Sequence, residues 1–217
     1  MSFEISRTPT LEAVSNSDET QLEADLKART SAAIEQVDEQ EDVKTAAETL
    51  LSSREKLAKL RRAERWLSQY AKEVEEKVTS LREPALDALI DAAAAGGKPE
   101  FKPLTEVGTW ESRARAISRA IQRLVETLLP VAEWTALREE SHWMTAKSRA
   151  LERMAQGRAE KLLGQMRDAV MEEMVLPVDL SKGVSGALLG HAAELRSRAI
   201  QISENADRIE KMRGFRR

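Results

Sequence analysis

Residues 43–95 read VKTAAETLLSSREKLAKLRRAERWLSQYAKEVEEKVTSLREPALDALIDAAAA. Apolar residues recur here at two positions of each seven-residue repeat. One series is Leu60, Leu67, Val74 and Leu81, and its companion, interrupted by one glutamate, is Val43, Leu50, Leu57, Glu64, Ala71, Val78 and Ala85. Two such positions per heptad form the narrow seam of helix-on-helix packing, and charged residues fill the flanks. The stretch therefore predicts one long helix whose seam a partner helix covers.

Pro84 lies inside this pattern. Proline lacks the amide donor of a helix interior and clashes with the preceding turn. We expect either a kink at Pro84 or a break, with Pro84 as the first residue of a short helix ending at Gly96–Gly97.

The rest of the chain predicts further helices near 18–37, 109–176 and 181–213. Glycines and prolines in residues 96–108 predict a hairpin tip, after which Thr109 caps the next helix. Pro177 predicts a second turn over 175–184. The first seam of the 109–176 helix is expected at Ile117, Ile121, Leu124, Leu128 and Val131, with a kink at Pro130.

Composition agrees with helix throughout, because the chain has only 9 Gly, 6 Pro and 1 Tyr in 217 residues. We predict an all-α fold: an elongated, antiparallel, coiled-coil-like bundle of three main helices and a short N-terminal helix. Residues 1–38 would form an acidic N-terminal arm with the short helix, and residues 39–217 the long-helix bundle. Without an apparent signal segment or apolar span, we expect a cytoplasmic protein.

Tryptophans and histidines could mark binding sites. Counting inward from the expected hairpin ends sets Tyr70 level with Trp134, with Trp66 and Trp143 nearby, which favours an aromatic packing layer over a ligand box. Glu139 and His142 have the spacing of a di-metal helix motif, which needs a second copy that the chain lacks. We predict no catalytic, cofactor or metal site, and no thiol chemistry because cysteine is absent.

Charge is distributed unevenly along the chain. Residues 1–42 hold 11 acidic and 3 basic side chains, a net charge of −8, which leaves +5 for residues 43–217. Basic residues recur at helical spacing in two rows, and we expect either a solvated surface or a surface for an acidic partner, such as the N-terminal arm or nucleic acid. The rows are Lys56, Lys59 and Arg62, and Arg115, Arg119 and Arg123.

Two apolar series are candidates for a seam between chains. They are Leu188, Leu195, Ile202 and Ile209, at seven-residue spacing, and Met144, Leu151 and Met154 in the distal half of the 109–176 helix. Narrow seams on long helices predict a non-enzymatic structural or adaptor protein that presents helices for self-association or for a larger assembly. The alternatives are a nucleic-acid-associated helical protein and a membrane-surface helical scaffold.

Overall fold

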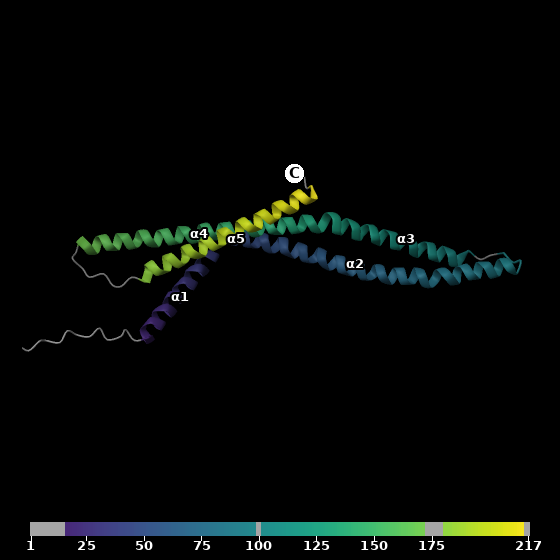
Figure 1. The fold of residues 1–217 in the computed structure, drawn as a ribbon, viewed down its shortest axis with the longest axis horizontal. Helices are drawn as coiled ribbons and strands as arrows, with labels where there is room; N and C mark the ends of the chain where they lie inside the picture. Colours follow the sequence, from purple (N-terminus) through teal and green to yellow (C-terminus); the bar gives the residue numbers. More distant parts are fainter. Residues whose placement is uncertain (1–15, 99–100, 172–179, 215–217) are drawn as a thin grey trace, which may run out of the picture. The chain divides into compact units, whose positions relative to one another are not determined.

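The computed structural model describes residues 16–98, 101–171 and 180–214, and the regular structure of these residues is all-helical (Figure 1). The described regular elements are α1 (Asn16–Asp38), α2 (Glu41–Ala94), α3 (Lys102–Arg123), the π-helical segment η1 (Leu124–Leu128), α4 (Leu129–Met171) and α5 (Leu180–Arg213). The all-helical prediction is therefore confirmed; the third expected helix begins earlier than predicted, is divided by η1, and its expected end at 176 lies outside the described residues. Pro177 and residues 1–15 lie outside the described residues.

Contacts divide the chain into two compact units. Unit 1 contains Met1–Lys44 and Met144–Ser197, and unit 2 contains Thr45–Trp143 and Arg198–Arg217. The helices α2, α4 and α5 each contribute residues to both units. The sequence-based division into an arm over 1–38 and a bundle over 39–217 stays a prediction.

In unit 2, α2 runs antiparallel to the continuous α3–η1–α4 segment. Three ion pairs between them define the register, because the residue number falls on α2 as it rises on the other segment. These pairs are Arg82–Glu111 at 2.5 Å, Arg61–Glu133 at 2.8 Å and Arg54–Glu140 at 2.8 Å. Every position of the predicted α2 seam is buried or half-buried, as the heptad pattern predicted.

The connection between α2 and α3 is shorter than the predicted 96–108. α3 begins at Lys102, with Pro103 in its first turn. Amide groups in the first turn of a helix have no intrahelical acceptor, so the missing amide of proline costs no hydrogen bond there. Thr109 therefore lies inside the helix and is no N-cap; its hydroxyl donates to the Thr105 carbonyl at 2.9 Å. Helix α2 continues through Pro84 to Ala94, which excludes the predicted break.

The π-helical segment η1 corrects the predicted seam beyond Leu124. Here the Leu129 amide donates to the Leu124 carbonyl, five residues back, directly before Pro130, which has no amide to donate. The wider turn rotates all later residues, so Leu128 and Val131 are about two-fifths exposed instead of seam residues. The buried residues after the segment are Leu129, Pro130, Ala132 and Ala136.

The end of α5 that belongs to unit 2 packs along α4. Arg138 reaches two carboxylates of α5, Asp207 at 2.6 Å and Glu210 at 3.4 Å. The Ser141 hydroxyl donates to the Ala199 carbonyl at 2.9 Å. Since the distance is short and Ala199 is buried, this alanine side of α5 lets the two backbones approach closely.

Unit 1 has a core of apolar side chains from α1, the start of α2, α4 and α5. Its side chains with at most 1% exposure are Ala33, Val37, Val43, Ala150, Leu151, Ala155, Val184, Leu188 and Ala192. The hydroxyl of buried Ser148 donates to the Ala192 carbonyl at 2.8 Å, so this polar group is hydrogen-bonded within the core. The apolar spacing of α4 and α5 is thus used within the chain.

The turn between α1 and α2 is held by two cations of α4. Lys147 pairs with Asp38 at 2.5 Å, at the C-terminal end of α1, and Arg153 pairs with Asp42 at 2.6 Å, at the start of α2. The acidic run at 38–42 is therefore both a turn and a helix start. A carboxylate in the first turn of α2 is also favourably placed for the helix dipole.

Candidate interaction surface

Both predicted basic rows are exposed in unit 2, but the structure does not bring them together. The Arg82–Glu111 pair places Arg123 level with Tyr70. The nearest residue of the other row, Arg62, is eight positions further along α2, or roughly 12 Å at the rise of an α-helix. The rows are therefore separate basic stripes.

Acidic residues accompany the α3 row. Glu111 accepts from Arg82 and lies 4.0 Å from Arg115, the intrahelical pair expected from a spacing of four. Arg115 is still about 72% exposed along its side chain. Its guanidinium is therefore only weakly committed within the chain.

The predicted seam between chains is largely covered by the chain itself. Met144 is 9% exposed, Leu151 1% and Leu188 fully buried. The other members, Met154, Leu195, Ile202 and Ile209, are half-buried. We predict association through this seam because no other segment is certain to cover it; in the structure, its buried members belong to the core of unit 1.

The predicted aromatic layer is wrong. Trp134 follows Glu133, which pairs with Arg61, so Trp134 lies level with Leu60 and about 15 Å along the axis from Tyr70. The error follows from the hairpin tip, whose true position shifts the pairing by about ten residues. Trp66 instead stacks on Tyr70, within α2, with ring centroids 5.2 Å apart.

Trp134 has a different environment. The Arg138 guanidinium lies 5.6 Å from its ring centroid, and its Nε1 is buried without a hydrogen-bond partner among the described residues. A buried unpaired donor costs free energy that a purely apolar ring would not.

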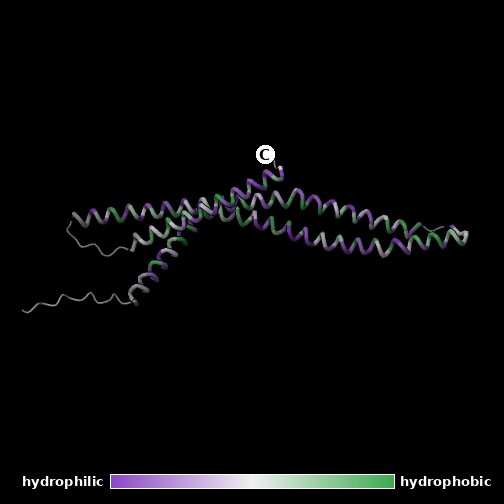
Figure 2. The backbone as a smooth tube through the Cα atoms, in the orientation of Figure 1, coloured by the Kyte–Doolittle hydropathy of each residue, from purple (hydrophilic) through white to green (hydrophobic). Residues whose placement is uncertain are grey.

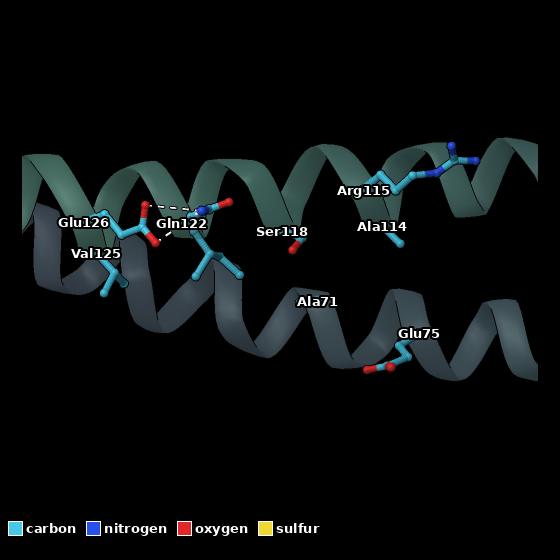
Figure 3. Close-up of a pocket in the computed structure, with 9 residues that line it drawn as sticks. Ala71, Glu75, Ala114, Arg115, Ser118, Gln122, Val125 and Glu126 are labelled. Atoms are coloured by element: carbon cyan, nitrogen blue, oxygen red, sulfur yellow. Dashed lines mark hydrogen bonds between the residues drawn. The ribbon is translucent and has the colours of Figure 1, made fainter.

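A groove of about 710 Å³ lies between α2 and the α3–η1 segment, and sequence reasoning missed it (Figure 3). Its lining combines small, apolar and charged residues: Ala71, Glu75, Ala114, Arg115, Ser118, Ile121, Gln122, Val125 and Glu126. Ala71 on α2, and Ala114 and Ser118 on α3, have small side chains that leave the space unfilled. The signal in the sequence was the alanine at Ala71, in the seam series of α2 that has leucine at Leu50 and Leu57.

Charges lie at the two ends of the α3–η1 side of this groove. Arg115 lies near one end and Glu126 near the other, while Ser118 lies between them (Figure 3). The Gln122 amide donates to both oxygens of the Glu126 carboxylate, at 3.1 and 3.2 Å. Among the described residues, Glu126 has no cation partner.

A second groove, of about 590 Å³, adjoins the first through Val125. Three arginines and two glutamates line it: Arg61, Arg65, Arg213, Glu64 and Glu133, with Val125, Leu129 and Pro130 as its apolar part. Because Arg213 is the last helical residue of α5, the second groove lies where α5 ends beside α2 and α4. The first groove continues beyond that end.

One carboxyl has a shifted pKa. The hydrogen bond from Arg153 holds the pKa of Asp42 below its ordinary value; desolvation opposes the shift, and the Arg153 charge and the Val43 amide add to it. Asp42 is about half exposed, so the pair is a modest electrostatic contact of unit 1.

The described residues contain no group of three histidine or acidic side chains arranged to hold a metal ion. Hydrophilic and hydrophobic residues alternate along the helices (Figure 2), and within the described ranges none is long and apolar enough to cross a bilayer. The sequence matches no protein-family model, and neither a curated protein nor a solved structure is similar to it.

Proposed function

We propose that this chain is a non-enzymatic structural or adaptor protein that presents long helices for self-association or for assembly into a larger complex. The observation that carries the proposal is the α2–α3 pair of unit 2. In Figure 1 these two helices extend to their connecting turn with no third helix of unit 2 beside them. Their shared seam is mostly half-buried, which leaves apolar surface for another chain.

Exposed apolar side chains on this pair support the same function. Near the connecting turn, Leu86, Ile90 and Phe101 are 44%, 63% and 62% exposed. Single exposed apolar residues need no explanation, but three at one end of a helix pair are typical of a protein interface.

The test is the mass of the full chain in solution. Light scattering over a wide concentration range should give masses that rise above the chain mass of 24.2 kDa. A mass that stays at this value at every accessible concentration would refute self-association.

A nucleic-acid-associated protein is the second candidate, and the exposure of all six predicted basic side chains favours it. Its test is binding to duplex DNA and RNA at low and moderate salt, because neutralised phosphates make affinity fall steeply with salt.

A further inference from the structure

We infer that the groove between α2 and α3–η1 is a self-complementary interface, which a second copy of this chain occupies in antiparallel orientation about a two-fold axis. This inference rests on the proposed function and names its partner. It begins from the charges on the α3–η1 side of the groove, Arg115 and Glu126, which differ in sign.

The spacing of these charges suits a two-fold arrangement. They are eleven residues apart, about three helical turns, and both line the same groove. In a two-fold dimer each contact occurs twice, with the residues exchanged between copies. If the two α3–η1 segments cross antiparallel midway between them, Arg115 of each copy meets Glu126 of the other.

Within the part of the chain that the structure describes, neither charge has a close cation–carboxylate contact. Arg115 lies 4.0 Å from Glu111, whose other oxygen is already 2.5 Å from Arg82. Glu126 accepts only the neutral amide of Gln122 among the described residues. Both side chains are therefore available to a second copy.

The middle of the groove suits close approach of a helix. Ser118 lies between the two charges, and Ala71 and Ala114 line the same hollow, so small side chains leave room for a second backbone beside Gln122, which also lies between the charges (Figure 3). Ile121 and Val125 supply apolar contact, and Val125 is 40% exposed in the single chain. A dimer would bury this surface.

Packing elsewhere in unit 2 agrees with an additional helix at this position. The C-terminal end of α5 packs against α4 through the Arg138–Asp207 pair. Arg213, the last helical residue of α5, lines the second groove. The first groove shares Val125 with the second. A helix from the second copy would thus extend an existing helix-on-helix interface of unit 2.

The test uses charge reversal at the two ends of the groove. Arg115→Glu alone and Glu126→Arg alone each place like charges opposite one another twice, and each should weaken the dimer about tenfold or more. An equimolar mixture of the two variants should restore the dimer, because both contacts in the mixed pair then join opposite charges. Light scattering measures all four samples at one total concentration.

Lys77→Glu is the matched control, because Lys77 is exposed on α2, does not line the groove and lies on a different face of that helix from Glu75, which does. It should leave the dimer as in the wild type. Circular dichroism should show unchanged helix content in all variants, since both reversed positions are exposed.

The outcomes separate the two proposals. A wild-type dimer that neither reversal weakens, or a mixture that stays monomeric, overturns the groove interface and leaves self-association through another surface. A wild type that is monomeric at every concentration overturns the groove interface and self-association together. If each variant alone is weakened and their mixture forms the dimer again, the groove interface is supported, because variants that had lost folding or solubility would not recover the dimer on mixing.

Discussion

Leu188→Ala should destabilise unit 1 by about 3 kcal/mol. Leu188 is fully buried, and replacing a buried leucine with alanine removes its apolar contacts and leaves a cavity. For a chain of this length, an m-value of about 2 to 3 kcal/mol per molar urea converts this loss to a midpoint shift of about 1 M. The adjacent Leu189 is 48% exposed, so Leu189→Ala is a control in the same helical turn and should cost less than about 1 kcal/mol.

Urea unfolding followed by circular dichroism measures both variants. All four tryptophans lie in unit 2, so their fluorescence reports that unit, whereas the dichroism at 222 nm reports the helices of both. Coincident transitions would mean that the units unfold together. Separate transitions would assign the effect of Leu188→Ala to the phase that the tryptophans do not report.

Protein concentration decides whether this leucine belongs to the chain's own core or to an interface between chains. A core within one chain gives a midpoint for the Leu188 region that does not depend on concentration, whereas an intermolecular seam is stabilised as concentration rises. Equal midpoints for Leu188→Ala and Leu189→Ala would refute the assignment of Leu188 to the core of unit 1.

Three further predictions concern Trp134, Asp42 and the acidic arm. Trp134→Ala should cost about 3 kcal/mol, but Trp134→Phe less than half of that, because phenylalanine removes the unpaired Nε1 donor; equal costs in urea unfolding would contradict this. Because the folded pKa of Asp42 is lowered, its pair with Arg153 stabilises the fold above the ordinary carboxyl pKa and is lost as the pH falls below about 4. Asp42→Asn should remove up to about 1 kcal/mol at pH 7 and less at pH 3, and an equal effect at both would argue against the pair. If the acidic arm masks a nucleic-acid site, a chain in which its exposed Glu23, Asp25 and Glu35 are replaced by the amides should bind duplex DNA or RNA with a steep salt dependence that Arg119→Glu abolishes; no binding by either form at low salt would exclude that site.

The helices themselves were predictable because their apolar spacing extends over many heptads. The α2 seam needed no knowledge of tertiary structure, since two positions per heptad specify one face of a helix. Its charged flanks specified the solvated face in the same way. Local propensity and periodicity agree along this helix, and it continues through Pro84, where the sequence predicted a kink or a break.

Pairing between helices was less predictable, because it depends on where a turn ends. Taking Thr109 as a cap displaced the expected pairing by about ten residues and produced an aromatic layer that does not exist. A proline is as compatible with the first helical turn as with a loop, so the sequence around Pro103 did not distinguish the two. An error in where one helix starts therefore shifts every expected pairing between residues of the two helices.

The π-helical segment and the groove were missed for related reasons. A wider turn before Pro130 shifts the buried face by about one position, and nothing in the α-helical periodicity announces the shift before it occurs. The groove is defined by absent volume at Ala71, Ala114 and Ser118, whereas periodicity records which residues are apolar and not how well they fill space.

The composition of unit 1 has a consequence for how the chain acquires its structure. Its two segments, ending at Lys44 and beginning at Met144, are separated by a long stretch that belongs to unit 2. Joining distant segments requires a large loop to close first, whereas α2 and α3 meet across a short turn. During synthesis the α2–α3 hairpin can therefore form before α1 packs, because the helices that cover α1 emerge later from the ribosome. Pulse-labelling hydrogen exchange during refolding should accordingly show protection of the hairpin amides before those of α1.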